Sequence, residues 1–139
     1  MSSKLPMMHH VVFAVAAERL DAATRFLEVL GLRFQTHVLD DVGLRVTLDW
    51  HRGVELVTPT EPQDRNPGSV AGFLARNGDG VFSVVMRVED ADASMELARR
   101  YGASAEFRQD RSGDGLELVE VQLATTFGMS LTFLSTNLR

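Results

Sequence analysis

Two stretches decide the fold, because each repeats the pattern of the other: His10-Val-Val-Phe-Ala-Val15 and Ser83-Val-Val-Met-Arg-Val88. Both are rich in apolar and β-branched residues, which is typical of a largely buried strand. Each is followed by an amphipathic segment that ends at a glycine, Gly31 in the first half and Gly102 in the second. The two strands lie 73 positions apart and the two glycines lie 71 positions apart. The sequence therefore predicts an internal repeat.

Each half predicts a strand, a helix and three further strands. In the first half, Leu20, Ala23 and Leu27 recur at spacings of three and four, which predicts a helix over residues 20–30. Alternating segments bounded by turn residues predict the strands that follow. The expected ranges are strands 33–39, 44–50 and 54–58, then helix 91–101, then strands 105–108, 116–123 and 129–134. A stretch rich in proline and glycine separates the halves and contains one short helical piece, 70–76.

The predicted fold class is α+β. Two βαβββ modules are expected to form an eight-stranded, mostly antiparallel curved sheet, a half-barrel with its helices on the convex face. The expected boundaries are residues 1–58 for the first module, 59–80 for the linker and 81–139 for the second module. The concave face of such a sheet can enclose a cleft.

The composition excludes several classes of protein. The chain has 139 residues, of which 45% are hydrophobic and 24% charged, as in ordinary globular domains. No apolar run is long enough for a membrane helix, and the first ten residues do not resemble a secretory signal, so we expect a cytoplasmic protein without a membrane partner. A net charge of −5 without a basic tract argues against a nucleic-acid partner. The lack of cysteine excludes thiol chemistry and cysteine-ligated metals.

Three segments carry a resemblance to a known family: Met8-His-His-Val-Val-Phe-Ala-Val15, Gly53-Val-Glu-Leu-Val-Thr-Pro59 and Ala71-Gly-Phe-Leu-Ala-Arg-Asn77. Together with the doubled βαβββ pattern, they resemble the vicinal oxygen chelate superfamily. This superfamily includes glyoxalase I, bleomycin-resistance proteins, extradiol dioxygenases and methylmalonyl-CoA epimerase, and the epimerase-like members are the nearest. The resemblance supports the fold class, but a fold does not fix a reaction.

The resemblance also implies where a metal would bind. The four ligand positions of metal-dependent members fall on His10, Glu55, Ser83 and Thr132. An imidazole and a carboxylate suit zinc, manganese, iron or nickel, whereas serine and threonine hydroxyls are weak ligands for these ions. We therefore expect no firmly bound cofactor, and at most a weakly held divalent metal on His10 and Glu55.

His10 and Glu55 are also the candidate catalytic residues. Strand alternation predicts that His10 faces the cleft together with Val12, while Phe13 faces a helix. Glu55 is an isolated carboxylate in an apolar strand, which requires a partner: a metal, His10, or an arginine such as Arg45 or Arg87. The candidate ligand-binding residues are Arg45, Thr47, Asp49, Ser83, Arg87 and Thr132. By the resemblance, Asp40 and Asp41 hold the place of a proposed base, but such a pair before Gly43 is also a routine turn signal.

Three functions fit these residues. The first is a protein that binds a small organic molecule in the cleft without chemistry, similar to bleomycin-resistance proteins. The second is a metal-dependent lyase, isomerase or dioxygenase that acts on vicinal oxygens through His10 and Glu55. The third is a metal-free enzyme in which the same pair transfers a proton. Exposed sheet edges further predict a homodimer.

Overall fold

The computed structural model describes residues 4–61 and 68–139. It divides into two compact units, His10–Phe82 and Ser83–Arg139, the second of which includes the residues up to His9. The predicted α+β fold class is confirmed, with an eight-stranded sheet built from two βαβββ modules. Of the predicted linker, residues 62–67 lie outside the described residues, and the module boundaries stay a prediction. No helix in the described part of the chain has the length and hydrophobicity to cross a membrane.

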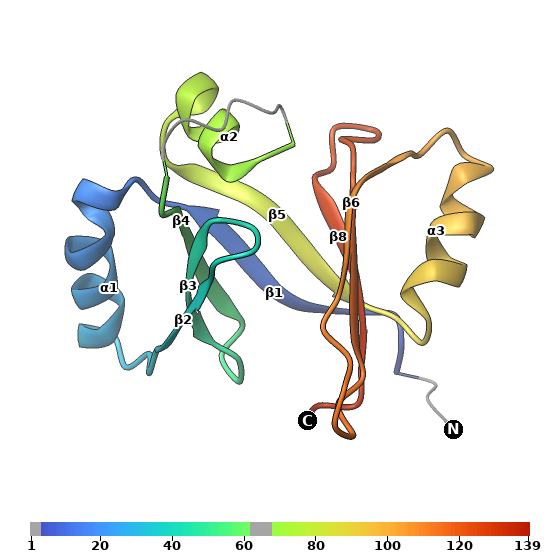
Figure 1. Cartoon of the computed structure of the whole chain (residues 1–139), viewed down its shortest axis with the longest axis horizontal. Coiled ribbons are helices and arrows are strands. Elements are labelled where there is room, and N and C mark those ends of the chain that lie inside the picture. The colour runs from blue at the N-terminus through green and yellow to red at the C-terminus, as the bar shows by residue number, and fades with distance from the viewer. Residues whose placement is uncertain (1–3, 62–67) are drawn as a thin grey trace. The chain divides into compact units, whose positions relative to one another are not determined.

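The N-terminal module contains four strands and one long helix. Its elements are β1 (Met7–Ala14), η1 (Ala17–Arg19), α1 (Leu20–Val29), β2 (Gln35–Leu39), β3 (Leu44–Asp49) and β4 (Val54–Pro59). The strand order is β2-β3-β4-β1; β1 runs parallel to β4, and the other pairs are antiparallel. Figure 1 shows α1 beside β2, β3 and β4. A short helix, α2 (Val70–Asn77), follows this module.

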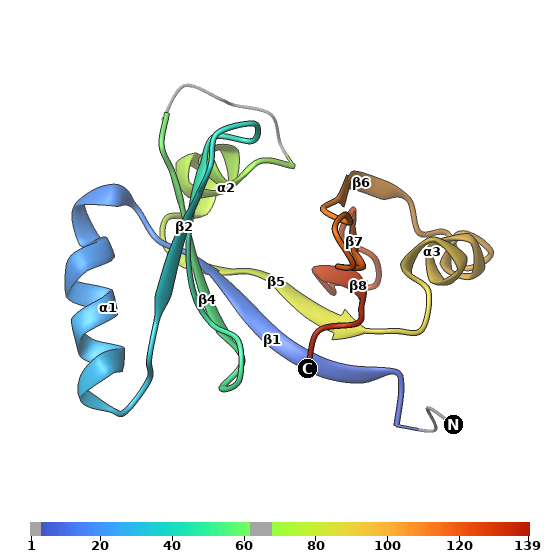
Figure 2. The ribbon, with the colours of Figure 1, turned by 60° about the horizontal axis from the view of Figure 1, so that its bottom comes forward.

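The C-terminal module repeats this plan. Its elements are β5 (Gly80–Arg87), α3 (Ala91–Arg99), β6 (Ala105–Asp110), β7 (Leu118–Leu123) and β8 (Leu131–Thr136). The strand order is β5-β8-β7-β6, with β5 parallel to β8. In Figure 2, α3 lies on one side of β6, β7 and β8.

The strand register confirms the internal repeat. In the N-terminal module Val12 lies opposite Glu55, and in the C-terminal module Val85 lies opposite Thr132. These partners are related by the offsets seen in the sequence, because Val85 follows Val12 by 73 positions. Glu55 and Thr132 therefore occupy equivalent places in the two modules, as do His10 and Ser83.

Helix α1 covers one face of its sheet. Leu20 is buried in a cluster with Val15 and Leu56, and Phe13 and Val54 pack against this cluster. The helix ends before Gly31, whose φ of +112° is favourable only for glycine. Because neighbouring residues of a strand point to opposite faces, Glu55 must point away from α1. We call the side of the sheet opposite α1 the His10 face.

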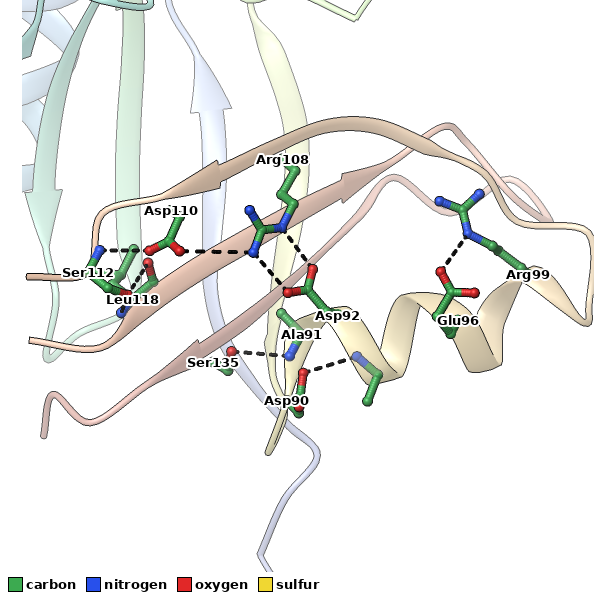
Figure 3. A network of polar contacts seen from close by, with 11 residues as sticks. Asp90, Ala91, Asp92, Glu96, Arg99, Arg108, Asp110, Ser112, Leu118 and Ser135 are labelled. Carbon is green, nitrogen blue, oxygen red and sulfur yellow. Dashed lines mark hydrogen bonds and ion pairs between the residues drawn. The ribbon is translucent and has the colours of Figure 1, made fainter.

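Helix α3 packs on the C-terminal module in the same way. Its buried residues Ala91 and Met95 join Val121 and Leu123 in one apolar cluster. Asp90 caps the N-terminus of the helix, and its carboxylate accepts a hydrogen bond from the Ala93 N–H at 3.0 Å. Figure 3 shows the polar contacts that join the outer strand β6 to this helix, chiefly the two bonds from the Arg108 guanidinium to Asp92.

Candidate functional site

A buried histidine and a carboxylate form the centre of the candidate site. The His10 Nε2 lies 3.1 Å from the Glu55 Oε1. His10 is only 4% exposed, and the Glu55 side chain is 16% exposed. The ring of Trp50 lies beside His10, with centroids 6.0 Å apart and planes tilted by 44°. The pair and the indole thus lie together within the N-terminal module.

The parallel strands β1 and β4 place this pair. Val12 lies opposite Glu55, and His10 precedes Val12 by two positions, so all three share the His10 face. The flanking residues Val54 and Leu56 are held in the α1 cluster, which fixes the face to which Glu55 points. Shifting β4 by one residue would turn the Glu55 carboxylate toward the apolar α1 cluster, and shifting β1 would turn the His10 imidazole toward it, so the register is strongly specified.

The pair has a clear chemical capacity. An ionised carboxylate is only an acceptor, so the imidazole Nε2–H donates to Glu55 Oε1. In the described part of the chain, no other hydrogen bond reaches the Glu55 carboxylate. Glu55 is also the more exposed member of the pair. The arrangement therefore holds a carboxylate in a fixed orientation and leaves its second oxygen able to accept a proton.

A hydroxyl pair occupies the equivalent place in the C-terminal module. Ser83 Oγ and Thr132 Oγ1 lie 2.8 Å apart, and both residues are buried. Ser83 Oγ also lies 3.4 Å from the carbonyl oxygen of Ser130. The two modules therefore place a chargeable pair and a neutral pair at matching positions.

The residues present do not fit a four-ligand metal centre. Of the four candidate ligand positions, only His10 and Glu55 carry donor groups that suit zinc, manganese, iron or nickel, and these two side chains are hydrogen-bonded to each other. At the other two positions, the Ser83 and Thr132 hydroxyls are bonded to each other. Across residues 4–61 and 68–139, no three histidine, aspartate or glutamate side chains form a group that could hold a metal ion.

The structure corrects the predicted orientation of β3. Directly opposed residues of an antiparallel pair share a face. Thr47 lies opposite Leu56, and Asp49 lies opposite Val54, so both are on the α1 side of the sheet. Arg45, in the same alternation, also lies on that side. The expectation that Arg45, Thr47 and Asp49 share a face with His10 is therefore wrong. The residues of β3 that do share it are Val46 and Leu48.

Asp49 has a structural task instead. Its buried carboxylate accepts hydrogen bonds from the backbone N–H of Arg33 at 2.8 Å and of Arg52 at 3.1 Å, and from the Arg52 guanidinium at 3.2 Å. Burial raises the pKa of Asp49, but the N–H donors and the nearby positive charge outweigh it, so the pKa is lowered. Asp49 thus fixes the turn after β3 and the chain before β2.

The other predicted residues lie at the ends of strands. Arg87 donates to the carbonyl oxygen of Thr136 at 2.8 Å, at the end of β8. Asp40 and Asp41 are exposed in the turn between β2 and β3, and their interpretation as a base stays a prediction.

Sequence reasoning missed two residues on the relevant faces. Trp50 is not among the candidate residues, but its ring lies beside that of His10. Gln122 lies directly opposite Thr132 and therefore shares its face. The alternation of Glu120 and Gln122 with Val119 and Val121 carried that signal.

Comparison with known proteins supports the fold. No protein-family model matches the chain, and no curated protein matches it either. Among solved structures, methylmalonyl-CoA epimerase from Mycobacterium tuberculosis is similar, with 24% identity, a TM-score of 0.71, and coverage of 97% of this chain and 91% of that one. A Streptomyces coelicolor methylmalonyl-CoA epimerase in complex with 2-nitronate-propionyl-CoA gives 23% identity, a TM-score of 0.75, and coverage of 96% and 99%. A hypothetical protein from Bacillus halodurans gives 15%, 0.75, and 97% of both chains. The chain therefore has the fold of methylmalonyl-CoA epimerases.

Proposed function

We propose that the chain binds a small organic carbonyl compound of the acyl-thioester class and that Glu55, oriented by His10, exchanges a proton with it. The observation that carries this proposal is the 3.1 Å contact between the His10 Nε2 and the Glu55 Oε1 on the sheet face opposite α1. A positioned carboxylate of this kind is a suitable general base. The proton exchanged would be the one on the carbon next to the thioester carbonyl, since the carbonyl acidifies that position.

Two further points support the ligand class. A solved structure with this fold is a methylmalonyl-CoA epimerase in complex with methylmalonyl-CoA, and another holds 2-nitronate-propionyl-CoA. Thioesters also present a carbonyl oxygen that hydroxyl and guanidinium groups can bind. Ser83, Thr132 and Arg87 are therefore kept as proposed ligand contacts, whereas Arg45, Thr47 and Asp49 are not.

Binding without chemistry is the second candidate function. The hydroxyl pair at Ser83 and Thr132 favours it, because these positions supply neither a charge nor a strong metal ligand. A metal-dependent reaction through His10 and Glu55 is the least supported function, because only these two of the four ligand positions carry side chains that suit such a metal. A homodimer remains part of the proposal.

The test measures binding and proton exchange separately. Protein treated with a chelator is titrated calorimetrically with propionyl-CoA, methylmalonyl-CoA and free CoA. Exchange of the proton next to the carbonyl is then followed by NMR in D₂O. Glu55→Gln keeps the shape of the side chain but removes the base, and Glu61→Gln is the matched control because Glu61 is an exposed carboxylate of the same unit.

The proposal expects thioesters to bind more tightly than free CoA, and exchange to be lost in Glu55→Gln but kept in Glu61→Gln. Thioester binding without exchange in any variant would support the second candidate. Exchange that appears only after zinc, manganese, iron or nickel is added would instead support the metal-dependent reading. If no thioester binds at millimolar concentration, the proposed ligand class is wrong.

A further inference from the structure

The turn between β3 and β4 carries a tryptophan next to the candidate pair. The turn consists of residues 50–53, and Trp50 directly follows Asp49, the last residue of β3. The indole ring of Trp50 lies beside the imidazole of His10, with ring centroids 6.0 Å apart. His10 is buried and Trp50 is partly buried, so the contact between the two rings is largely shielded from water.

Hydrogen bonds fix this turn relative to His10. The Gly53 N–H donates to the Asp49 carbonyl oxygen at 3.0 Å, and the Arg52 N–H donates to the Asp49 carboxylate at 3.1 Å. On its other side, the Gly53 carbonyl oxygen accepts a hydrogen bond at 3.0 Å from the N–H of Val11, the residue that follows His10. The φ of Gly53 is +77°, in the left-handed region that favours glycine. The backbone that carries the indole is therefore held beside His10.

The C-terminal module offers a comparison within the same chain. In its β7–β8 turn, Phe127 precedes Thr132 by five positions. Trp50 precedes Glu55 by five positions as well, so the two turns carry aromatic residues at matching places. Phe127, however, is 78% exposed, and its module has a hydroxyl pair instead of the histidine and the carboxylate. The turn aromatic is thus packed inward in the module that has the chargeable pair, and exposed in the module that has the neutral one.

We propose that Trp50 is a positioning residue, whose ring holds the His10 imidazole in the orientation in which its Nε2–H donates to Glu55. The χ2 torsion of histidine has broad minima, so the ring needs packing as well as hydrogen bonds to keep one orientation. The orientation of the Glu55 carboxylate then follows from that of its donor. The effect of Trp50 on proton exchange rests on the proposed function, whereas its effect on His10 does not.

NMR of the unmodified full chain without ligand tests the contact between the rings. Nuclear Overhauser effects are expected between the indole protons of Trp50 and the ring protons of His10. The imidazole Nε2–H proton should be observable, because its hydrogen bond to Glu55 is shielded from water. In Trp50→Leu this proton should broaden or exchange with water. Absent ring contacts in the unmodified chain, or an unchanged Nε2–H signal in Trp50→Leu, would overturn the proposal.

The rate of proton exchange at saturating thioester tests the consequence for the proposed function. Misplacing a reacting group slows a reaction more than it weakens binding, so Trp50→Leu should lower the exchange rate about tenfold and change the dissociation constant less than about threefold. Trp50→Phe keeps an aromatic ring and should recover most of the lost rate. The matched control is Phe73→Leu, which disrupts another aromatic contact of the same unit, the edge-to-face pair of Phe73 and Phe82 with centroids 5.6 Å apart. Its exchange rate should equal that of the unmodified chain.

Far-UV circular dichroism verifies that each variant is folded, and Trp50→Met takes the place of Trp50→Leu if the latter is not. A dissociation constant that rises about tenfold at an unchanged rate would make Trp50 a ligand contact and overturn the proposal. So would equal losses of rate in Trp50→Leu and Phe73→Leu, since the loss would then follow stability alone. If the unmodified chain exchanges no proton with any thioester, the proposed function fails, and the NMR measurements alone decide whether Trp50 positions His10.

Discussion

Replacing His10 by leucine is expected to lower the free energy of unfolding by about 1–3 kcal/mol at pH 7, because it leaves the Glu55 carboxylate without its hydrogen-bond donor. Leucine is apolar and similar in volume, so little cavity is created. The cost arises instead from a carboxylate whose side chain is only 16% exposed and whose cross-strand neighbours are the apolar Val12 and Leu48. Such a group has lost much of its hydration and has no other partner among the described residues.

The magnitude follows from burial. Exposed ion pairs contribute about 0–1 kcal/mol, since water screens them and two flexible side chains must be ordered. His10 is buried, and its ring is already packed beside Trp50, so little additional ordering is required for the 3.1 Å contact. A hydrogen bond to a charged group in such a setting contributes about 1.5–3 kcal/mol.

A double-mutant cycle measures the interaction directly. The single variants His10→Leu and Glu55→Leu and their combination are unfolded in urea and followed by far-UV circular dichroism, because Trp50 fluorescence would respond to the substitutions themselves. We expect a coupling energy of about 1 kcal/mol or more. The pair Glu96–Arg99, which is exposed on α3, serves as the control and should show no measurable coupling. If the His10 and Glu55 effects add within about 0.5 kcal/mol, the two side chains do not stabilise each other and the reasoning fails.

Three other predictions follow from particular contacts. Asp49→Asn should cost about 1–3 kcal/mol at neutral pH, because the buried carboxylate satisfies two backbone N–H groups. Because the pKa of Asp49 is lowered in the folded state, its carboxylate stabilises the fold above about pH 4, and this stabilisation is lost as the pH falls through the folded-state pKa. The free energy of unfolding of Asp49→Asn should therefore decline less steeply in acid than that of the unmodified chain. An equally steep decline in both proteins would contradict this. Asp90→Ala should cost about 1 kcal/mol by removing the N-terminal cap of α3, as measured by thermal or urea unfolding, and a loss below the error of the method would contradict the cap. Elemental analysis of protein purified without a metal-affinity tag should find substoichiometric zinc, manganese, iron and nickel, and stoichiometric metal that resists a chelator would revive the metal-dependent reading.

The internal repeat could be predicted from the sequence because hydrophobic alternation and turn residues determine it. Val12 and Val85 lie in apolar β-branched runs, and Gly31 and Gly102 end the helices, so alternation and turn chemistry determine the elements. The same rule did not predict which residues of β3 lie on the helix side of the sheet. Both faces of this strand bury residues, with Val46 on one side and Thr47 and Asp49 on the other. When polar residues are buried by hydrogen bonds, hydropathy no longer indicates which side meets the helix, and only the pairing register does.

The candidate site was predictable in its members but not in its contacts. Glu55 stood out because a carboxylate between Val54 and Leu56 needs a partner, and the family resemblance paired it with His10. The sequence left a metal, His10 and two arginines open as partners of Glu55, and the 3.1 Å distance identifies His10 as one. The catalytic role of His10 and Glu55 stays a prediction. The contact between Trp50 and His10 depends on how the β3–β4 turn bends, which the sequence pattern does not specify.

The neutral pair in the C-terminal module offers a way to separate ligand binding from folding. Ser83→Ala alone removes one hydroxyl and leaves that of Thr132 buried without its partner, which should cost about 1 kcal/mol of unfolding free energy. Adding Thr132→Val replaces the second hydroxyl by an apolar group of the same shape, so the double variant should recover most of that loss. The double variant then keeps the fold while lacking both proposed ligand contacts. If it binds acyl thioesters as tightly as the unmodified chain in the same calorimetric titration, Ser83 and Thr132 are structural residues and recognition rests on the N-terminal module. If its affinity falls while its stability is retained, the hydroxyls contact the ligand.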